Sequence, residues 1–397
     1  MLTWATFKNF LKVSAFLVFT IIFVALTAGI IYFSIDLVQE KNNLMDIEEY
    51  SPRSSLVVEQ NPKDRSKFPF VDVHSHQWKM PIMDLSELVS EMESLNMGYM
   101  INLSGSGFGT FVGYQDLMDL SLTKSIENVE SQGLSNRFGV FVNVDFNKID
   151  EEDFAENNVR IIKDAVKQGA IGLKVYKNLG LNLKDSSGAR VKVDDVRLNP
   201  IWKVCGELKI PVLIHSGEPS PFFDPIDKYN ERWLHARQKP ASFRSPDKYP
   251  SFEVVMQEQY NMFENNPNTT FINAHLGWYG NDLDKLSEQL DNLSNVYTEI
   301  GAVIAELGRQ PIRAKRFFVE HQDRVLFGKD TYKKSEYNVY FRILETSDEY
   351  FDYYRKRHAH WKMYGLNLPD SILKKLYYKN ALKLFPSIPA DLFEMKN

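Results

Sequence analysis

The chain has a single cysteine, Cys205, which excludes an internal disulfide and a cysteine-based zinc site. Its net charge is only −5, with acidic and basic residues interleaved, so the sequence lacks the basic surface that nucleic-acid binding requires. It also lacks internal repeats and low-complexity tracts. With 397 residues, 44% of them hydrophobic, the chain is long enough for one large α/β domain with insertions.

One long segment carries no charge at all, residues 13–35. A helix over this range, at about 1.5 Å per residue, is long enough to cross the hydrocarbon core of a bilayer. Lys8 and Lys12 precede it and acidic residues follow from Asp36 on. The positive-inside rule therefore predicts a cytoplasmic tail at 1–12, a membrane anchor, and a catalytic domain on the periplasmic or extracellular side. A cleaved signal peptide is the alternative, but its apolar part is usually only about 7–15 residues.

Strand-like and helix-like segments alternate through most of the remaining chain. Residues 36–66 are polar and predict a spacer, whereas 67–397 predicts an α/β domain of the (β/α)8 TIM-barrel class. The connection at 217–251 is rich in proline, aromatic and charged residues. Long loops of this kind are commonly lids, so we expect it to cover the mouth of the barrel; an ordinary surface excursion is the alternative. The expected strands are 68–74, 97–104, 137–146, 170–176, 210–216, 269–275, 295–302 and 323–330.

Four of these predicted strands end in histidine or aspartate, residue types that commonly bind metals in proteins. Side chains two apart on a strand point to the same side, and the C-terminal ends of barrel strands gather at one face. Imidazoles and a carboxylate that meet there are a ligand set for a divalent transition metal. This pattern predicts a metal-dependent hydrolase or lyase, and it is made by His74, His76, His215, His275 and Asp330.

The motifs around these residues resemble the amidohydrolase superfamily, and most closely its amidohydrolase-related branch, which includes metal-dependent decarboxylases, hydratases and lactone hydrolases. The resemblance extends over about 68–386 and depends on VHSH, GLKVYK, VLIHSGEP, INAHLGW, VLFGKDT and YYKNALKLF. It implies that His74, His76 and His215 bind the metal. It also implies that Asp330 touches the metal and accepts a proton from its water. His275 would be a second-metal ligand or an acid/base group.

Four further residues are candidates for substrate contact. Lys174 is expected to point into the barrel, where an unmodified lysine is costly unless paired. It resembles the carboxylated lysine that bridges two metals in binuclear relatives, but it could instead hold a substrate carboxylate or lie at the solvated rim. Lys177, Glu299 and Arg232 are the other candidates, from the following loop, the end of the seventh strand and the insertion.

The main functional prediction is hydrolysis by a metal-activated water, with an amide, an ester or lactone, or a carbon–carbon bond as the target. Non-oxidative decarboxylation or hydration of a carboxylic acid is the alternative, and a non-catalytic surface binding protein is a third. Histidine-rich ligands suit zinc, with manganese or iron also compatible, at one or two ions per chain. The expected partners are a small molecule, with a carboxylate as one candidate, and the membrane; a homo-oligomer is left open.

Overall fold

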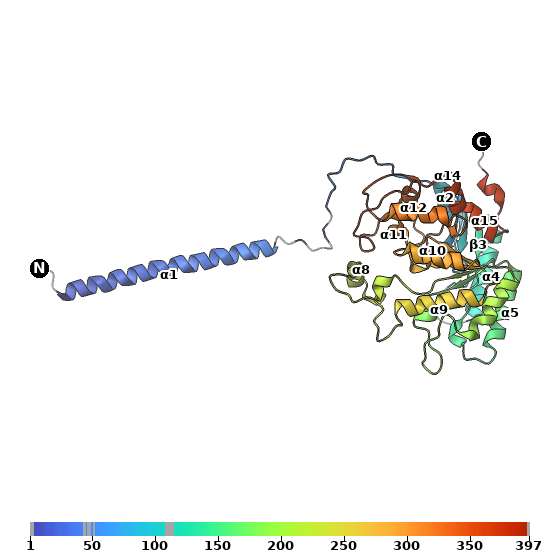
Figure 1. The fold of residues 1–397 in the computed structure, drawn as a ribbon, viewed down its shortest axis with the longest axis horizontal. Coiled ribbons are helices and arrows are strands. Elements are labelled where there is room, and N and C mark those ends of the chain that lie inside the picture. Colours follow the sequence, from blue (N-terminus) through green and yellow to red (C-terminus); the bar gives the residue numbers. More distant parts are fainter. Residues whose placement is uncertain (1–3, 43–44, 46–48, 51, 108–114, 395–397) are drawn as a thin grey trace. The chain divides into compact units, whose positions relative to one another are not determined.

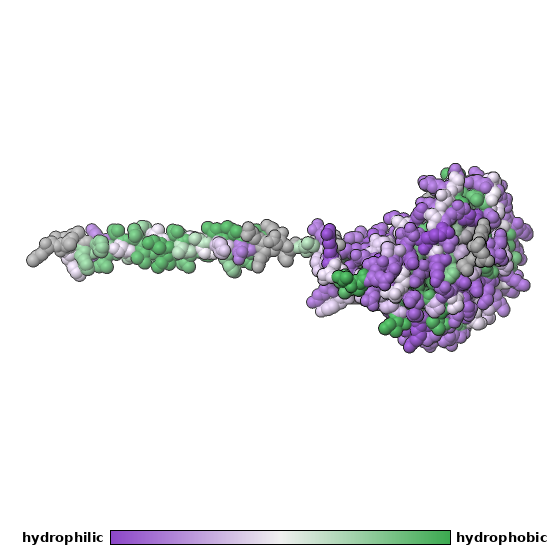
Figure 2. Space-filling model, turned by 90° about the horizontal axis from the view of Figure 1, so that it is seen from above, coloured by the Kyte–Doolittle hydropathy of each residue, from purple (hydrophilic) through white to green (hydrophobic). Residues whose placement is uncertain are grey.

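The computed structural model describes residues 4–42, 45, 49–50, 52–107 and 115–394. The chain divides into two compact units, Met1–Val57 and Val58–Asn397, which we treat separately. In the first unit, helix α1 (Trp4–Asn42) contains a segment, Phe7–Val38, that is long and apolar enough to cross a membrane. Apolar side chains run along this helix, as Figure 2 shows. A signal sequence would have the same character.

In its described residues the second unit contains eight parallel strands, and each overlaps a range expected from the sequence, although the first runs one residue past its range to Ser75. They form two sheets, of order β1-β2-β3 and β4-β5-β6-β7-β8. Every strand pairs in parallel with its sequence neighbour inside its sheet, as in a TIM barrel. The strands are β1 (Phe70–Ser75), β2 (Met97–Asn102), β3 (Phe138–Val140), β4 (Leu173–Val175), β5 (Val212–Ile214), β6 (Phe271–Asn273), β7 (Val296–Glu299) and β8 (Val325–Leu326).

Backbone contacts also link the two sheets at both of their ends. Val142, just after β3, bridges Leu173 of β4. On the other side, Ser75 of β1 bridges Asp330 beyond β8, and the Val73 amide donates to the Phe327 carbonyl at 3.0 Å. The ends of β1 and β8 therefore lie side by side, which brings together two of the segments that carry predicted metal ligands.

Helices connect the strands and surround them in Figure 1. Several begin or end with the expected local signals: Ser251 and Asp282 cap the starts of two helices, and Gly169 ends another in the left-handed conformation. The principal helices are α2 (Ser86–Leu95), α4 (Gln115–Ser131), α5 (Phe154–Gln168), α7 (Asn199–Glu207), α9 (Phe252–Asn265), α10 (Leu283–Asn292), α12 (Pro311–Glu320), α13 (Tyr337–Glu345), α14 (Asp370–Lys374) and α15 (Asn380–Leu384).

Alternation along the strands divides the core into an inner and an outer part. On β5, Val212 and Ile214 pack in the larger cluster with helix residues, whereas Leu213 packs with Ile272 and Leu326 of other strands. On β4 the two residues that flank Lys174 belong to the larger cluster, so Lys174 lies on the opposite side of its strand. This confirms the side of the strand that the sequence predicts for Lys174.

Both ends of the predicted spacer, 36–66, belong to structured parts of the protein. The helix α1 continues past Ile35 to Asn42, because nothing in that stretch breaks a helix. The second unit begins at Val58, and Asn61 already belongs to it: its backbone and side-chain amides both donate to Asp348, whose side chain is buried. The range 36–66 is therefore shared between the two units, with its first residues in α1 and its last residues in the second unit.

The long insertion after β5 is folded onto the barrel. It contains the short helix α8 (Trp233–Gln238), and Arg232 just before it pairs with Glu306 of α11 (Ile304–Gly308) at 2.6 Å. Near its end, Arg244 pairs with the buried Glu218. Whether the insertion opens and closes as a lid stays a prediction.

Candidate metal centre

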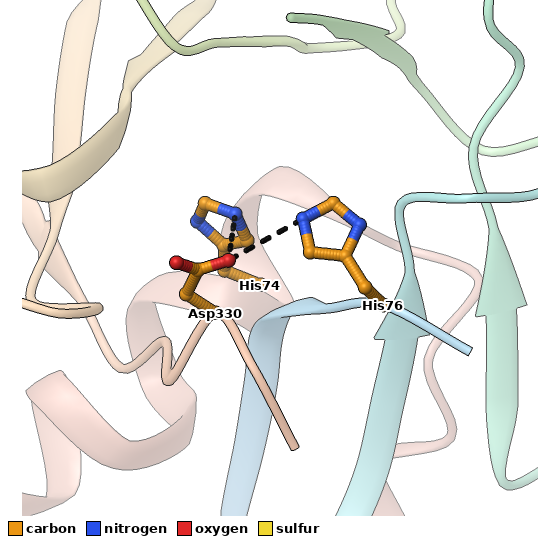
Figure 3. Close-up of side chains that lie close together, drawn as sticks. All are labelled: His74, His76 and Asp330. Atoms are coloured by element: carbon orange, nitrogen blue, oxygen red, sulfur yellow. Dashed lines mark ion pairs between the residues drawn. The ribbon is translucent and has the colours of Figure 1, made fainter. Parts of the chain in front are cut away.

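Three of the predicted ligands meet at the junction of β1 and β8. The Oδ1 atom of Asp330 lies 3.6 Å from Nε2 of His74 and 3.5 Å from Nε2 of His76 (Figure 3). These separations are too long for hydrogen bonds. They are close to the roughly 3.3–3.6 Å that separates ligand atoms arranged tetrahedrally about a metal at about 2.0–2.2 Å. The geometry is therefore that of a set of ligands around a shared cation.

Backbone geometry fixes the position of Asp330. Its amide donates to the His74 carbonyl at 2.6 Å, which ties the two ligand-bearing segments together. Its φ of 78° lies in the left-handed region, a strained conformation for a residue other than glycine. Strain of this kind is commonly retained at functional sites because the surrounding structure enforces it.

A buried carboxylate, Glu299 at the end of β7, holds the ring of His74. Its Oε1 lies 3.0 Å from Nδ1 of His74 and accepts the His275 amide at 2.7 Å, while Oε2 accepts the Gly301 amide. The Nδ1 atom of His74 is then the proton-bearing nitrogen, and Nε2 keeps its lone pair for a metal. Glu299 is fully buried, and these contacts favour a role in orienting His74 over the substrate contact that we expected from the sequence.

Close packing at Gly328 depends on its lack of a side chain. A Cβ atom there would lie 2.3 Å from Oε2 of Glu299 and 2.9 Å from Cβ of His74. The glycine in the VLFGKD motif thus allows the β8 end to approach both residues.

The other two histidines form a pair beside this centre. The Nδ1 atom of His275 lies 2.8 Å from the Gly301 carbonyl, and its Nε2 lies 3.2 Å from Nδ1 of His215. Its ring centroid is 4.9 Å from that of His74. His275 begins a left-handed turn that continues through Gly277 to Trp278, a costly conformation for L-residues. In this arrangement His275 contacts His215 directly, and its acid/base role stays a prediction.

Two ring nitrogens in these groups are buried without a hydrogen-bond partner in the described part of the chain, Nε2 of His74 and Nε2 of His215. Buried polar atoms are almost always paired. A cation bound at both nitrogens would account for the exceptions, although His215 is not within the close group that His74, His76 and Asp330 make.

The charge states also suit a metal. Burial lowers the pKa of His74 and of His215 well below 6.5, and it lowers that of His76 to about 4, so the imidazoles are neutral near pH 7. Burial would raise the pKa of Asp330, but the surrounding basic side chains, His74 foremost and Lys174 among them, hold it at about 2. Neutral imidazoles with an ionised carboxylate are the protonation states that metal binding requires.

The predicted substrate-contact lysines and arginine differ sharply in their surroundings. Lys174 is 1% exposed, and its Nζ has no hydrogen-bond partner among the residues that the structure describes. Lys177 pairs with Glu218 at 2.7 Å and is partly exposed. Arg232 is buried, bound to Glu306 and to the His358 carbonyl, and attaches the insertion to the barrel. Of the three, only Lys174 lacks an ion pair and a hydrogen bond within the described residues, so its charge is the one that a bound anion would satisfy.

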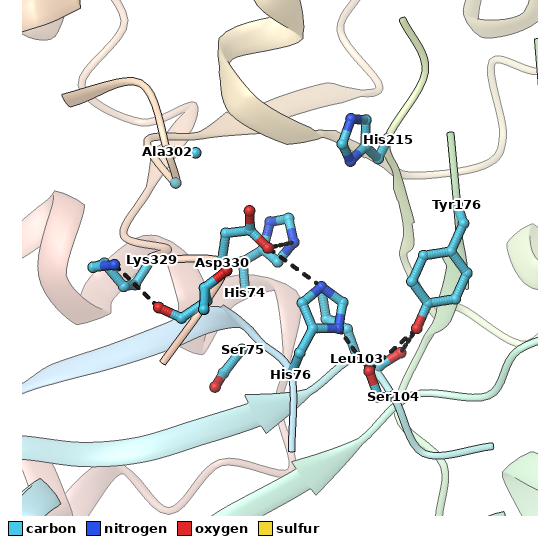
Figure 4. Close-up of polar contacts among 12 residues, drawn as sticks. His74, Ser75, His76, Leu103, Ser104, Tyr176, His215, Ala302, Lys329 and Asp330 are labelled. Atoms are coloured by element: carbon cyan, nitrogen blue, oxygen red, sulfur yellow. Dashed lines mark hydrogen bonds and ion pairs between the residues drawn. The ribbon is translucent and has the colours of Figure 1, made fainter. Parts of the chain in front are cut away.

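An aromatic wall flanks the centre. The ring of His76 stacks with that of Trp78 at 5.5 Å and 7°, and with that of Tyr176 at 5.9 Å and 28°. Ser104 lies 2.6 Å from Nδ1 of His76 and 3.2 Å from the Tyr176 hydroxyl, which fixes the orientation of both rings (Figure 4). The sequence analysis missed Trp78 as part of the site, although its position two residues after His76 was a usable signal.

A second buried carboxylate, Asp72, was also missed. It accepts the His74 amide at 3.0 Å and the Lys329 amide at 3.1 Å, so it bridges β1 and the β8 end. Its position two residues before His74 in VDVHSH marked it as a candidate.

Comparison with protein families decides the identity at the level of family. The profile described as amidohydrolase matches residues 135–387, which is more than half of the chain. The chain belongs to the amidohydrolase family. This confirms the resemblance drawn from the sequence, and with the ligand geometry it makes the protein a metal-dependent enzyme of that family. A comparison with curated proteins finds no match.

Several solved structures share the fold of this amidohydrolase. The 2,6-dihydroxybenzoate decarboxylase from Rhizobium has a TM-score of 0.50 at 11% identity, over 80% of this chain and 99% of its own. A dihydroxybenzoic acid decarboxylase from Polaromonas sp. JS666 was solved with manganese and 2-nitroresorcinol. It has a TM-score of 0.51 at 12% identity, and the match covers 83% of this chain and 100% of that one. A TIM-barrel protein from Bordetella bronchiseptica has a TM-score of 0.50 at 13% identity, and the match covers 81% of this chain and 99% of that one. At these identities the likeness supports the TIM-barrel fold alone.

Proposed function

We propose that this amidohydrolase is a metal-dependent lyase that removes carbon dioxide from a planar, conjugated carboxylic acid. The observation that carries the proposal is the ammonium group of Lys174, which is buried beside the candidate metal centre and has no hydrogen-bond partner among the residues that the structure describes. The proposal prefers the decarboxylation alternative over the hydrolysis that the sequence first suggested. The Rhizobium and Polaromonas structures with the same fold are decarboxylases of dihydroxybenzoic acids, which is consistent with it.

Lys174 is suited to hold the substrate carboxylate. Burial is the main cause that lowers its pKa from 10.5 to about 8, so it remains mostly charged at pH 7. Within the described part of the chain Lys174 contacts the Tyr176 ring but makes no hydrogen bond or ion pair, which is costly for a buried charge, and a bound carboxylate would supply both. The centre is therefore better matched to an acid than to a neutral ester or amide.

The aromatic wall favours a flat substrate. The rings of Trp78, His76 and Tyr176 are within 28° of parallel, and a planar ring gains most when it stacks on such a surface. Together with Lys174, the wall suits an aromatic or otherwise conjugated acid.

His74, His76 and Asp330 are the residues that would hold the metal, with Nε2 of His215 as a further donor. A bound divalent cation would supply Lewis acidity toward an oxygen of the substrate. In the reaction the carbon–carbon bond to the carboxylate breaks, carbon dioxide leaves, and a proton takes its place on the ring carbon. Asp330 is part-exposed beside the aromatic wall and ionised at neutral pH, so we assign it to take a proton from solvent water and pass it to the ring carbon.

The test is a turnover assay on the full chain in detergent, reconstituted with manganese or zinc. A panel of hydroxylated aromatic acids carrying a ¹³C carboxyl group would be followed by NMR for labelled carbon dioxide and bicarbonate, with aryl esters and lactones alongside. We expect metal-dependent release from at least one acid. Turnover of the esters or lactones without any release from the acids would contradict decarboxylation.

Hydrolysis is the second candidate, and one observation favours it. The carboxylate of Asp330, with its pKa held at about 2, is ionised at neutral pH and could accept a proton from water. The ester and lactone arm of the same assay tests this candidate.

We also propose that α1 anchors the protein with the catalytic unit outside the cytoplasm. The charge difference across the apolar segment supports this orientation, with Lys8 and Lys12 before it and Asp36 after it. N-terminal sequencing of the protein from membranes tests the anchor: an intact N-terminus is expected, and a start beyond residue 35 would instead indicate a cleaved signal peptide. Digestion of intact cells or spheroplasts with protease tests the side.

A further inference from the structure

We propose that Lys329, which precedes Asp330, is a positioning residue that sets the geometry of the metal ligand. This inference rests on the metal centre proposed above. The side chain of Lys329 is only 2% exposed and does not point at the centre; Figure 4 shows it on the other side of Asp330 from His76. Its Nζ donates to Glu336 at 2.8 Å and to the carbonyl of Thr331 at 3.0 Å.

The contact with Thr331 closes a loop around the metal ligand. The lysine side chain spans Asp330 and binds the carbonyl on the far side of it, while the Lys329 amide donates to Asp72 at 3.1 Å. Both ends of the strained residue are therefore held, and its φ of 78° is maintained by contacts outside the centre.

The ammonium group of Lys329 lies among three tyrosine rings, which we call the lysine cage. The ring centroids of Tyr337, Tyr340 and Tyr354 lie 5.8, 5.6 and 5.4 Å from Nζ, within the range of cation–π attraction. Glu336 is itself held by Arg355 at 3.0 Å. A long flexible side chain is thereby fixed next to the ligand.

The same network reaches the second ligand-bearing strand through Asp72. Its Oδ1 accepts the amides of both His74 and Lys329, and its Oδ2 accepts the Tyr337 hydroxyl at 2.6 Å. Tyr337 thus forms part of the lysine cage on one side and touches the carboxylate beneath His74 on the other. The network holds His74 and Asp330 in register with one another.

Stability alone does not account for this arrangement. Replacing a buried ion pair with well-packed apolar groups is often neutral or stabilising, so such pairs contribute mainly where a unique geometry is needed. Here the geometry is that of a ligand whose carboxylate must meet two imidazole nitrogens. Residues that orient metal ligands from behind typically change metal affinity by about 10- to 100-fold when they are replaced.

The experiment measures metal binding by the full chain in detergent, stripped with a chelator. Free Mn²⁺ would be followed by EPR during titration, and bound Co²⁺ by its visible absorption, which reports coordination geometry. The variants are Lys329→Met and, in case that variant does not fold, Tyr337→Phe. Lys333→Met is the matched control, because Lys333 lies 3.9 Å from the same Glu336 but is exposed.

We expect Lys329→Met to weaken Mn²⁺ binding by about 10- to 100-fold and to alter the Co²⁺ spectrum, with Tyr337→Phe changing both in the same direction. The control should match the parent. Parent-like affinity and spectrum in Lys329→Met, or in Tyr337→Phe if the first does not fold, would overturn the inference while leaving the metal centre in place. Failure of the parent itself to bind metal would overturn the centre and this inference together.

Discussion

Replacement of Lys174 with methionine should make the protein more stable and, at the same time, unable to hold an acid. Methionine has a similar length and no charge, so it removes the buried ammonium without opening a large cavity. Two effects of opposite sign can then be measured on one variant, and each has a magnitude that follows from the structure.

The stability effect follows from the pKa of Lys174. Burial lowers it from 10.5 to about 8, so below pH 8 the folded protein carries a charge that the unfolded chain holds at less cost. That difference corresponds to roughly 3 kcal/mol. The cost is fully present below about pH 8 and fades as the pH rises toward 10.5, where the folded protein has released the proton. We therefore expect Lys174→Met to raise the free energy of unfolding at pH 7, and to do so less at pH 10.

The binding effect follows from the missing partner. Loss of one member of a buried charge pair in a complex costs about 2–5 kcal/mol, or roughly 30- to 5,000-fold in affinity. Lys177→Met is the comparison variant, because Lys177 is partly exposed and already paired with Glu218. Its replacement should weaken the free energy of binding the acid by less than about 1 kcal/mol.

The assays are urea unfolding and calorimetric titration of the metal-loaded protein with the aromatic acid identified by the turnover panel. Parent-like affinity in Lys174→Met would refute its assignment to the substrate carboxylate. Destabilisation of Lys174→Met at pH 7 would refute the account of a costly, unpartnered charge.

Three further predictions concern the centre and the insertion. Asp330→Asn should retain metal through the histidines but lose about 10²–10⁴ in turnover, and unchanged turnover measured at saturating metal would remove Asp330 as the proton carrier. In Gly328→Ala the new Cβ would lie 2.3 Å from Oε2 of Glu299. We expect this overpacking to lower the free energy of unfolding by about 1–3 kcal/mol and to weaken metal binding. Parent-like results in calorimetry and Mn²⁺ titration would contradict this. Burial, followed by the positive charge of Arg232, lowers the pKa of His235 to about 4 and that of His358 to about 2. The centroids of the two rings are 4.9 Å apart. Both imidazoles are neutral in the folded protein, so the stability of the insertion should fall as the pH drops below 6.5. Limited proteolysis within 217–251 should therefore be faster at pH 5 than at pH 7 in the parent. This pH difference should be smaller in a variant that carries both His235→Gln and His358→Gln.

Much of the fold could be predicted because barrel strands are short apolar runs that end in informative residues. Each of the eight expected ranges overlaps a strand, and the two histidines at the C-terminal end of the first strand meet the aspartate that follows the last one. Alternation along β4 also placed Lys174 on the correct side. These features depend on local pattern, which a sequence contains directly.

The roles of individual side chains depended on partners that are remote in sequence. Glu299 binds Nδ1 of His74 across 225 positions, and Arg232 meets Glu306 across 74. Nothing local distinguishes a buried glutamate that orients a histidine from one that contacts substrate. Similarly, the start of the second unit depends on how Asn61 meets Asp348, which no pattern near residue 61 reveals.

The most direct test of a single-metal centre is the metal content of the full chain after exhaustive dialysis, measured by elemental analysis beside the His74→Ala, His76→Ala double variant. We expect one divalent ion per chain in the parent and none in the variant, with Lys174 left as a free amine. Two ions per chain would contradict the account, because Lys174 would then be a candidate for a carboxylated bridge between metals. Metal retained by the double variant would contradict the ligand assignment itself.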